Sequence, residues 1–235
     1  MEYETPVMPL DAFQEAKARI TEIELPEKLK PVFSEMMDDF SNYFDSNPNL
    51  KLNVKEIFDK YLYNNLKIID LDEKDSFVDG IKVAGFYNKQ ENTIGIKNSA
   101  DVAGLKQSFA HEFIHFMVHN AYPKYLPVWA DEMMTEIMSG QVTGTEKYGY
   151  HNLVDFGKNC DTLVEPFMQI GSKEDAMFFN GEFKEYLQRN GMSNNTNLTQ
   201  VLEKFSINDG VLLEPEESVL PFKYCVENLL IGQKR

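Results

Sequence analysis

The stretch that decides how this chain is interpreted is His111-Glu112-Phe113-Ile114-His115. On an α-helix, residues four apart lie one above the other on the same face, so the two imidazoles can reach one point. Two histidines placed in this way can bind one zinc ion, and the glutamate beside them can act as a general base on a zinc-bound water molecule. The stretch therefore predicts a helix that carries a metal site.

The flanking sequence supports a helix here. Apolar residues recur at steps of three and four, a pattern typical of an amphipathic helix: Leu105, Phe109, Phe113, Phe116 and Met117. Ser99 or Asp101 can cap the start, and Pro123 ends the helix soon after Asn120. The alternative is a core helix whose histidines have only structural partners. The four-residue spacing with Glu112 between the histidines favours the metal site.

A second helix is expected downstream, and it supplies acidic residues with the same spacing. It follows Pro127, covers residues 129–136 and is expected to end at Gly140. Glu132 and Glu136 share one face, so one can be the third zinc ligand while the other accepts a hydrogen bond from a ligand histidine. The alternative is a solvated acidic face. Apolar residues on the same helix favour packing instead: Trp129, Met133, Ile137 and Met138.

Taken together, the two motifs resemble those of the gluzincin metallopeptidases, the group that contains thermolysin-like proteases and related zinc aminopeptidases. The second motif, Trp129-x-x-Glu132-x-x-x-Glu136, is similar to the W-x-x-E-G-x-A-E pattern of that group, with Met133 in place of the glycine. The resemblance implies zinc bound by three ligands, with a general base and a supporting carboxylate. The ligands would be His111, His115 and Glu132, the base Glu112 and the supporting carboxylate Glu136.

A third histidine, His119, follows the motif by one more helical turn. The metzincin group uses a third histidine ligand in the form H-x-x-G-x-x-H, and that continuation is absent here. At His119, two turns after His111, the helix has rotated so that the two side chains no longer lie on the same line along the helix. We therefore expect His119 to support the site or the fold rather than to bind the predicted zinc ion.

Residues before the motif helix predict a hairpin. Runs 81–87 and 93–96 are rich in β-forming residues, and the polar segment 88–92 between them is typical of a turn. In zincin folds a strand just before the motif helix borders the active-site cleft. The resemblance therefore implies that 93–96 is an edge strand to which an extended substrate can add. A further strand is expected over 67–71.

The remaining sequence is mainly helical, and we predict an α+β protein of zincin-like architecture. A small sheet would pack on the motif helix, followed by a mainly helical C-terminal half. Helices are expected over 10–20, 27–44, 54–64, 153–171, 173–190 and 198–205. The organisation would be an N-terminal helical segment (1–65), the sheet and zinc-site helices (66–140) and a helical C-terminal region (141–235). Together they would form one compact catalytic unit.

Composition excludes several classes of protein. A net charge of −15 argues against partners that are nucleic acids or anionic membranes. The sequence contains no run of 18 apolar residues, so we expect no membrane-spanning helix. The acidic start of the chain lacks the apolar stretch of a signal peptide. Cys160 and Cys225 have no metal-binding spacing and fit a reducing compartment, so we expect a cytoplasmic protein. The alternative is a single disulfide between these two cysteines.

The expected function is zinc-dependent peptide-bond hydrolysis with a peptide or protein as substrate. Glu112 would take a proton from the zinc-bound water and deliver it to the leaving amine. The oxyanion also needs a donor besides zinc, for which Tyr125 and His151 are candidates and Tyr150 a third. The alternative from another class is a catalytically weak zincin-fold module that regulates or binds a partner.

Overall fold

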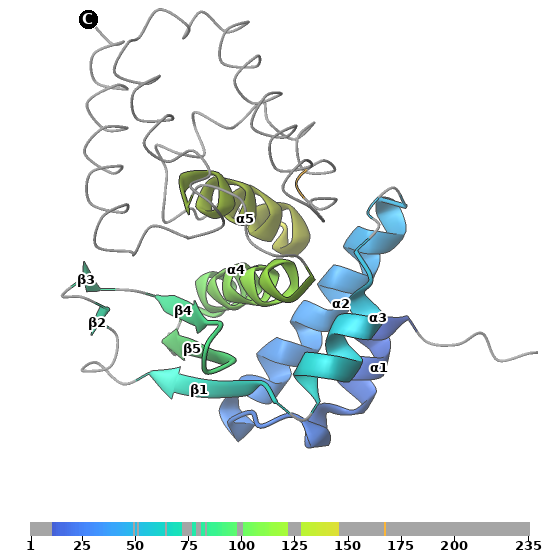
Figure 1. Ribbon diagram of the computed structural model, residues 1–235, viewed down its shortest axis with the longest axis horizontal. Coiled ribbons are helices and arrows are strands. Elements are labelled where there is room, and N and C mark those ends of the chain that lie inside the picture. Colours follow the sequence, from blue (N-terminus) through green and yellow to red (C-terminus); the bar gives the residue numbers. More distant parts are fainter. Residues whose placement is uncertain are drawn as a thin grey trace, which may run out of the picture.

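The structure of the chain is a computed structural model. It describes residues 11–48, 50, 52–63, 65–71, 77–78, 81–82, 84–97, 101–121, 128–145 and 167. This part is an α+β arrangement with a small three-stranded sheet and several helices (Figure 1). The three helices expected after residue 150 lie outside the described residues, except for the helical and fully buried Phe167. Four further residues of interest also lie outside them: Tyr125, His151, Cys160 and Cys225.

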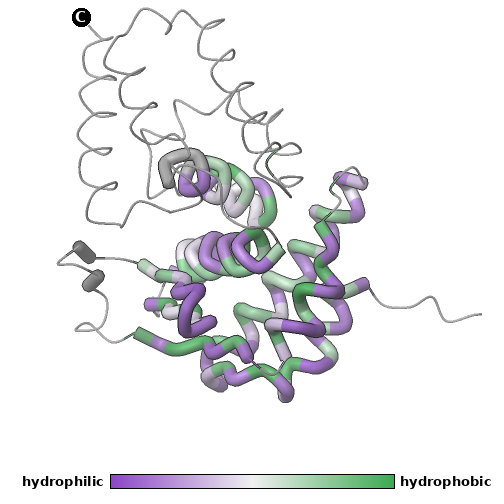
Figure 2. The backbone as a smooth tube through the Cα atoms, viewed as in Figure 1, coloured by the Kyte–Doolittle hydropathy of each residue, from purple (hydrophilic) through white to green (hydrophobic). Residues whose placement is uncertain are grey.

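The N-terminal part is helical, as expected. Helix α1 (Ala12–Ala18) begins after Asp11, whose side chain accepts a hydrogen bond of 2.8 Å from the Phe13 amide. Helix α2 (Lys30–Ser46) follows two short 3₁₀ turns, and α3 (Val54–Ile57) continues into a π-helical turn at Phe58–Leu62. Hydrophilic and hydrophobic residues alternate along these helices (Figure 2), and their buried apolar residues belong to the same core cluster as those of α4.

The three-stranded sheet has the order β1-β5-β4, where β1 is Lys67–Leu71, β4 is Gly85–Asn88 and β5 is Thr93–Lys97. Strands β1 and β5 are parallel, and β4 and β5 form the expected antiparallel hairpin. The expected run 81–87 is divided, because β3 (Ile81–Lys82) pairs instead with β2 (Phe77–Val78). Asn92 adopts a left-handed φ of 47° at the end of the hairpin turn.

One prediction about this sheet is wrong. Residues 93–96 are not an edge strand, because β5 lies between β1 and β4. The parallel partner β1 comes from much earlier in the chain, and local sequence patterns do not reveal such pairings. Within the described part of the sheet, β4 is the outer strand on the side of the hairpin.

Two long helices complete the described fold. Helix α4 (Val102–Ala121) packs on β4 and β5, and α5 (Val128–Thr143) packs on α4 (Figure 1). Gly140 does not end α5, contrary to expectation. The helix ends at Gly144, whose φ of +63° is a conformation that glycine adopts without strain, and the Thr145 amide bonds back to the Gly140 carbonyl at 3.2 Å.

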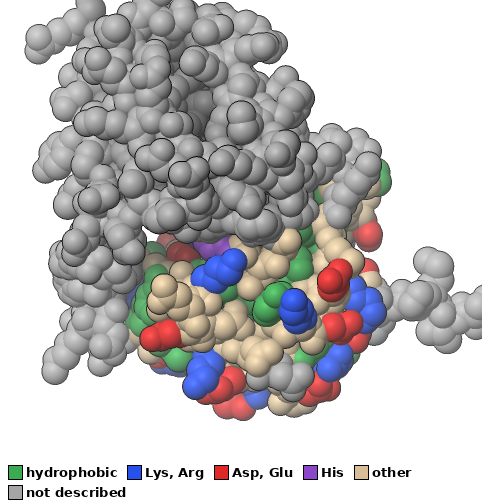
Figure 3. All heavy atoms as spheres, viewed as in Figure 1, with side chains coloured by type: hydrophobic (Ala, Val, Ile, Leu, Met, Phe, Trp, Pro, Cys, Tyr) green, Lys and Arg blue, Asp and Glu red, His purple; other side chains and the backbone are tan. Residues whose placement is uncertain are grey.

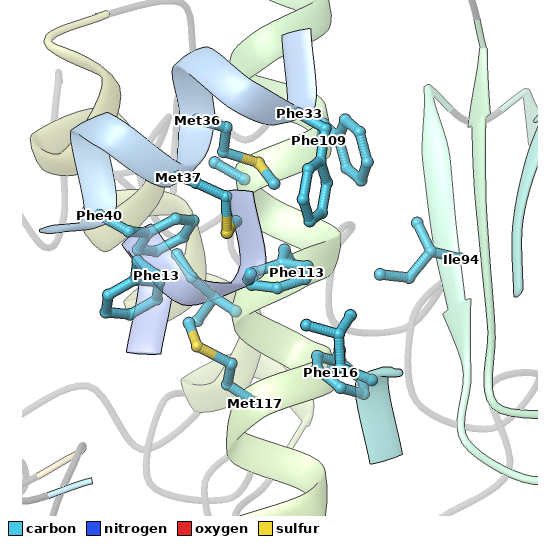
Figure 4. Packing of buried hydrophobic residues seen from close by; sticks show 14 of the residues in the cluster. Phe13, Phe33, Met36, Met37, Phe40, Ile94, Phe109, Phe113, Phe116 and Met117 are labelled. Atoms are coloured by element: carbon cyan, nitrogen blue, oxygen red, sulfur yellow. The ribbon is translucent and has the colours of Figure 1, made fainter. Parts of the chain in front are cut away.

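Helix α4 is also more deeply enclosed than its sequence pattern predicts. Every residue from Phe109 to His119 is buried, so the helix is not amphipathic over this stretch but is covered on all sides. Phe113 is fully buried and its ring contacts four others: Phe33, Phe40, Phe58 and Phe116 (Figure 4). Among the described residues, no helix combines the length and apolar character that a membrane crossing requires.

Candidate metal site

The predicted ligands come together where α4 faces α5. His111 and His115 lie one turn apart on α4, and Glu132 lies in the first half of α5. Nε2 of His111 is 3.1 Å from Nε2 of His115 and 3.2 Å from Oε2 of Glu132. Nε2 of His115 is 3.5 Å from Oε1 of Glu132. One donor atom from each of the three residues lies within 4.8 Å of the other two.

These separations test whether the three side chains fit a zinc ion. With bonds of about 2.0–2.2 Å in a tetrahedral arrangement, two ligand atoms lie about 3.3–3.6 Å apart. The distance of 3.5 Å falls within that range, and those of 3.1 and 3.2 Å lie just below it. All three side chains are buried or nearly so, with Glu132 the most exposed, at 26% of its side chain. The set fits a zinc ion and supplies three of the four ligands of a tetrahedral site.

Each ligand histidine also faces a carboxylate with its other ring nitrogen. Nδ1 of His111 is 2.7 Å from Oε2 of Glu136, the residue that the sequence predicts to support a ligand histidine. Nδ1 of His115 is 3.4 Å from Oδ2 of Asp131. A role for Asp131 was not expected from its sequence context. In the sequence, only its position directly before Glu132 could have indicated a role. That position does not determine whether the Asp131 side chain points towards α4.

Glu112 lies on α4 between the two ligand histidines, with the strand β4 beside it. It is 8% exposed, and no hydrogen bond or ion pair joins its carboxylate to another described residue. A Cβ at Gly85 would meet Cγ of Glu112 at 2.9 Å, so β4 approaches this side chain closely because residue 85 is glycine. Burial raises the pKa of the Glu112 carboxyl group, a direction that suits a residue that accepts a proton and later releases it.

The electrostatics of the site are dominated by contacts between histidines and carboxylates. Burial would lower the pKa of His111, but the hydrogen bonds that its ring donates to the carboxylates of Glu132 and Glu136 hold that pKa well above its usual range. Burial opposes protonation of His115 too, yet the charges of Asp131 and Glu132 raise its pKa to about 9. Burial would raise the pKa of the Glu132 carboxyl group, but the two histidines have the larger effect and lower it. A metal ion bound by the same nitrogens would displace protons, because only neutral imidazole is a ligand.

Comparison of the chain with protein-family models, with curated proteins and with solved structures finds no match. The interpretation of the site therefore rests on its own geometry. On the face drawn in Figure 3, a histidine side chain comes to the described surface beside acidic side chains. The expected oxyanion donors, Tyr125 and His151, lie outside the described residues.

Glu136→Gln should weaken zinc binding by about 10- to 100-fold, the usual cost of removing a carboxylate that orients a ligand histidine. The carboxylate oxygen of Glu136 lies 2.7 Å from Nδ1 of His111, and glutamine keeps the size but not the charge. The dissociation constant for Zn²⁺, measured by competition with a chromogenic chelator, checks this prediction.

Thr135→Val is the matched control for this experiment. Thr135 is fully buried on the same helix, and its hydroxyl makes no hydrogen bond with any described residue. Its zinc affinity should equal that of the wild type. Equal affinities for Glu136→Gln and Thr135→Val would show that Glu136 does not support the metal.

Proposed function

We propose that this protein is a zinc metallopeptidase of the gluzincin type, which hydrolyses peptide bonds with Glu112 as general base. The single observation that carries the proposal is the convergence of Nε2 of His111, Nε2 of His115 and the Glu132 carboxylate, with separations of 3.1–3.5 Å, beside a buried glutamate. The zincin-like architecture belongs to the same proposal. It is supported by a small sheet packed on the motif helix, with β4 antiparallel to its neighbour.

When bound, zinc supplies Lewis-acid chemistry: it lowers the pKa of water towards neutrality and polarises a carbonyl group. The ligand residues would be His111, His115 and Glu132. Glu112 accepts a proton from the attacking water molecule and passes it to the nitrogen of the leaving amine. Its raised pKa reduces the cost of holding that proton between the two steps.

Strand β4 is where we expect an extended peptide to bind. It pairs with β5 on one side, and within the described residues no strand pairs with its other side. An added strand would gain backbone hydrogen bonds there, with side-chain pockets to provide selectivity. Because Gly85 of β4 lies against Glu112, a peptide on this strand would bring its backbone close to the general base.

The proposal is tested by hydrolysis of a mixed peptide library, analysed by mass spectrometry. We expect cleavage by the protein as purified, loss of cleavage after removal of metal with a chelator, and recovery when Zn²⁺ alone is added back. Cleavage that survives chelation at full rate, in protein shown by elemental analysis to be free of metal, would contradict a zinc-dependent mechanism.

The same experiment separates an enzyme from a partner-binding module. A module that keeps the scaffold without turnover would bind zinc but cleave no peptide in the library. Zinc-loaded protein that cleaves neither the library nor an unfolded protein such as casein would favour that alternative over the peptidase.

Gly85→Ala should reduce hydrolysis while zinc stays bound. The added Cβ would lie 2.9 Å from Cγ of Glu112 and 3.0 Å from the Gly95 carbonyl oxygen. The carbonyl is part of the sheet, so the glutamate side chain is the group that moves. A general base displaced from its productive position costs rate, because catalysis depends strongly on geometry. The turnover number and the zinc content of the variant check this prediction.

Gly104→Ala is the control, because its added Cβ would meet only the Asp101 side chain. It lies in the first turn of α4, far along the helix from Glu112. Zinc content and turnover should match the wild type. An equal loss of turnover in both glycine variants would mean that the effect arises from α4 as a whole and not from the contact with Glu112.

A further inference from the structure

A second group of donor atoms lies around the other ring nitrogen of His115. Nε2 of His119 is 2.9 Å from Oδ2 of Asp131, and Nδ1 of His115 is 3.4 Å from the same oxygen. One donor atom from each of the three residues falls within 4.8 Å of the others. The three side chains are buried, with exposures of 5% for His115, 7% for His119 and 3% for Asp131.

The contact between His115 and Asp131 is not a hydrogen bond in the structure. Nδ1 of His115 is buried, and no described residue forms a hydrogen bond with it. A buried polar atom of this kind requires an explanation, such as an ion or a water molecule that completes its surroundings. The separation of 3.4 Å lies within the range of about 3.3–3.6 Å expected for two ligands of one tetrahedral zinc ion.

The balance of charge in the site also favours a second metal ion. Asp131, Glu132 and Glu136 all form ion pairs with the histidines of α4. A histidine that binds a metal is neutral, so these pairs no longer balance the carboxylates once a metal is bound. Three carboxylates exceed the charge of one divalent cation, and burial of uncompensated charge is costly. A second divalent cation beside Asp131 would reduce that excess.

We propose a second metal position formed by Nδ1 of His115, Nε2 of His119 and the carboxylate of Asp131. His115 would then bind one cation through each ring nitrogen, and its remaining ring proton would pass to solvent. This proposal depends on the proposed function in one respect only, which is that the first metal position exists. Two imidazoles and one carboxylate suit zinc and similar transition metals, whereas calcium and magnesium prefer oxygen ligands.

The sequence feature that this position would explain is the third histidine of α4. Histidines at 111, 115 and 119 are spaced by four residues, so each lies one turn from the next. The rings of His115 and His119 have centroids 5.0 Å apart, and those of His111 and His115 are 4.8 Å apart. His115 is therefore the middle of three adjacent imidazoles, with a carboxylate of α5 on each side.

The test is a titration of the metal-free full-length protein with Zn²⁺ alone, followed by isothermal titration calorimetry and by elemental analysis after dialysis. The wild type should bind two equivalents. His119→Ala and Asp131→Asn should each bind one, because they lose the second position and keep the first. His111→Ala should also bind one, because it loses only the first. Retention of one equivalent of zinc by each variant shows that the protein is still folded around the remaining position.

The possible failures are distinguishable. A wild type that binds one equivalent, unchanged in His119→Ala and lost in His111→Ala, would overturn the second position and leave the proposed function intact. Two equivalents in the wild type, in His119→Ala and in Asp131→Asn alike would place the second ion elsewhere and would also overturn it. No zinc bound by the wild type would overturn both this inference and the proposed function.

Discussion

Replacing Glu112 by glutamine is expected to lower the rate of peptide hydrolysis by about 10²- to 10⁴-fold, the contribution typical of general acid–base catalysis. Glutamine has nearly the same shape as glutamate but cannot accept the proton of the attacking water molecule. The carboxylate forms no hydrogen bond with another described residue, so little structural support is lost with it. Zinc should remain bound, because His111, His115 and Glu132 are unchanged.

The measurement is the turnover of a cleaved library peptide by protein samples matched for zinc content. Glu35→Gln, the same substitution at an exposed position of α2, is the control and should match the wild type. If Glu112 were only structural, its replacement would change the thermal unfolding temperature and leave the rate unaltered. Equal rates for Glu112→Gln and wild type would show that the proposed mechanism is wrong.

The second large effect is expected at His115, because His115→Ala should abolish stoichiometric zinc binding. Its Nε2 lies 3.1 Å from that of His111 and 3.5 Å from Glu132, so its removal leaves two donors where zinc needs at least three from the protein. Elemental analysis after dialysis measures the result. Gln107→Ala, at another buried polar position of α4, is the control and should retain zinc.

Retention of zinc by His115→Ala at the wild-type level would exclude His115 from the site. A circular dichroism spectrum equal to that of the wild type is needed alongside, because His115 is buried against other residues of α4 and α5. With the helices intact, loss of zinc reports the loss of a ligand rather than unfolding.

Much of the described fold follows from local sequence patterns. Local patterns predict the strand 67–71, the hairpin and the two long helices. Apolar residues recur with a period of 2 in strands and about 3.6 in helices, because one side of the element is buried. The convergence of His111, His115 and Glu132 is predicted for a related reason. Residues four apart on one helix share a face, and an acidic helix soon after it can return alongside.

What could not be predicted depends on contacts between distant segments. Strand β5 was expected at an edge, but β1 covers its other side, and that pairing joins segments far apart in the sequence. Helix α4 was expected to be amphipathic, yet α2, α5 and the sheet enclose it together. The pattern of one helix gives its apolar residues but not the number of neighbours that surround it.

The role of Asp131 depends on the register between α4 and α5. A shift of α5 by one residue would rotate Asp131 away from His115, and the sequence does not fix that register. The end of α5 is a smaller example. Gly140 was expected to end the helix, and only the left-handed φ of Gly144 identifies the residue that ends it.

The most direct test of the metal site is the anomalous scattering of zinc in crystals of the wild-type protein, recorded on both sides of the zinc absorption edge. The account predicts a peak bonded to Nε2 of His111, Nε2 of His115 and a carboxylate oxygen of Glu132, at about 2.0–2.2 Å from each. A zinc ion bonded to Glu136 while Glu132 points to solvent, or no peak between the two histidines, would contradict it.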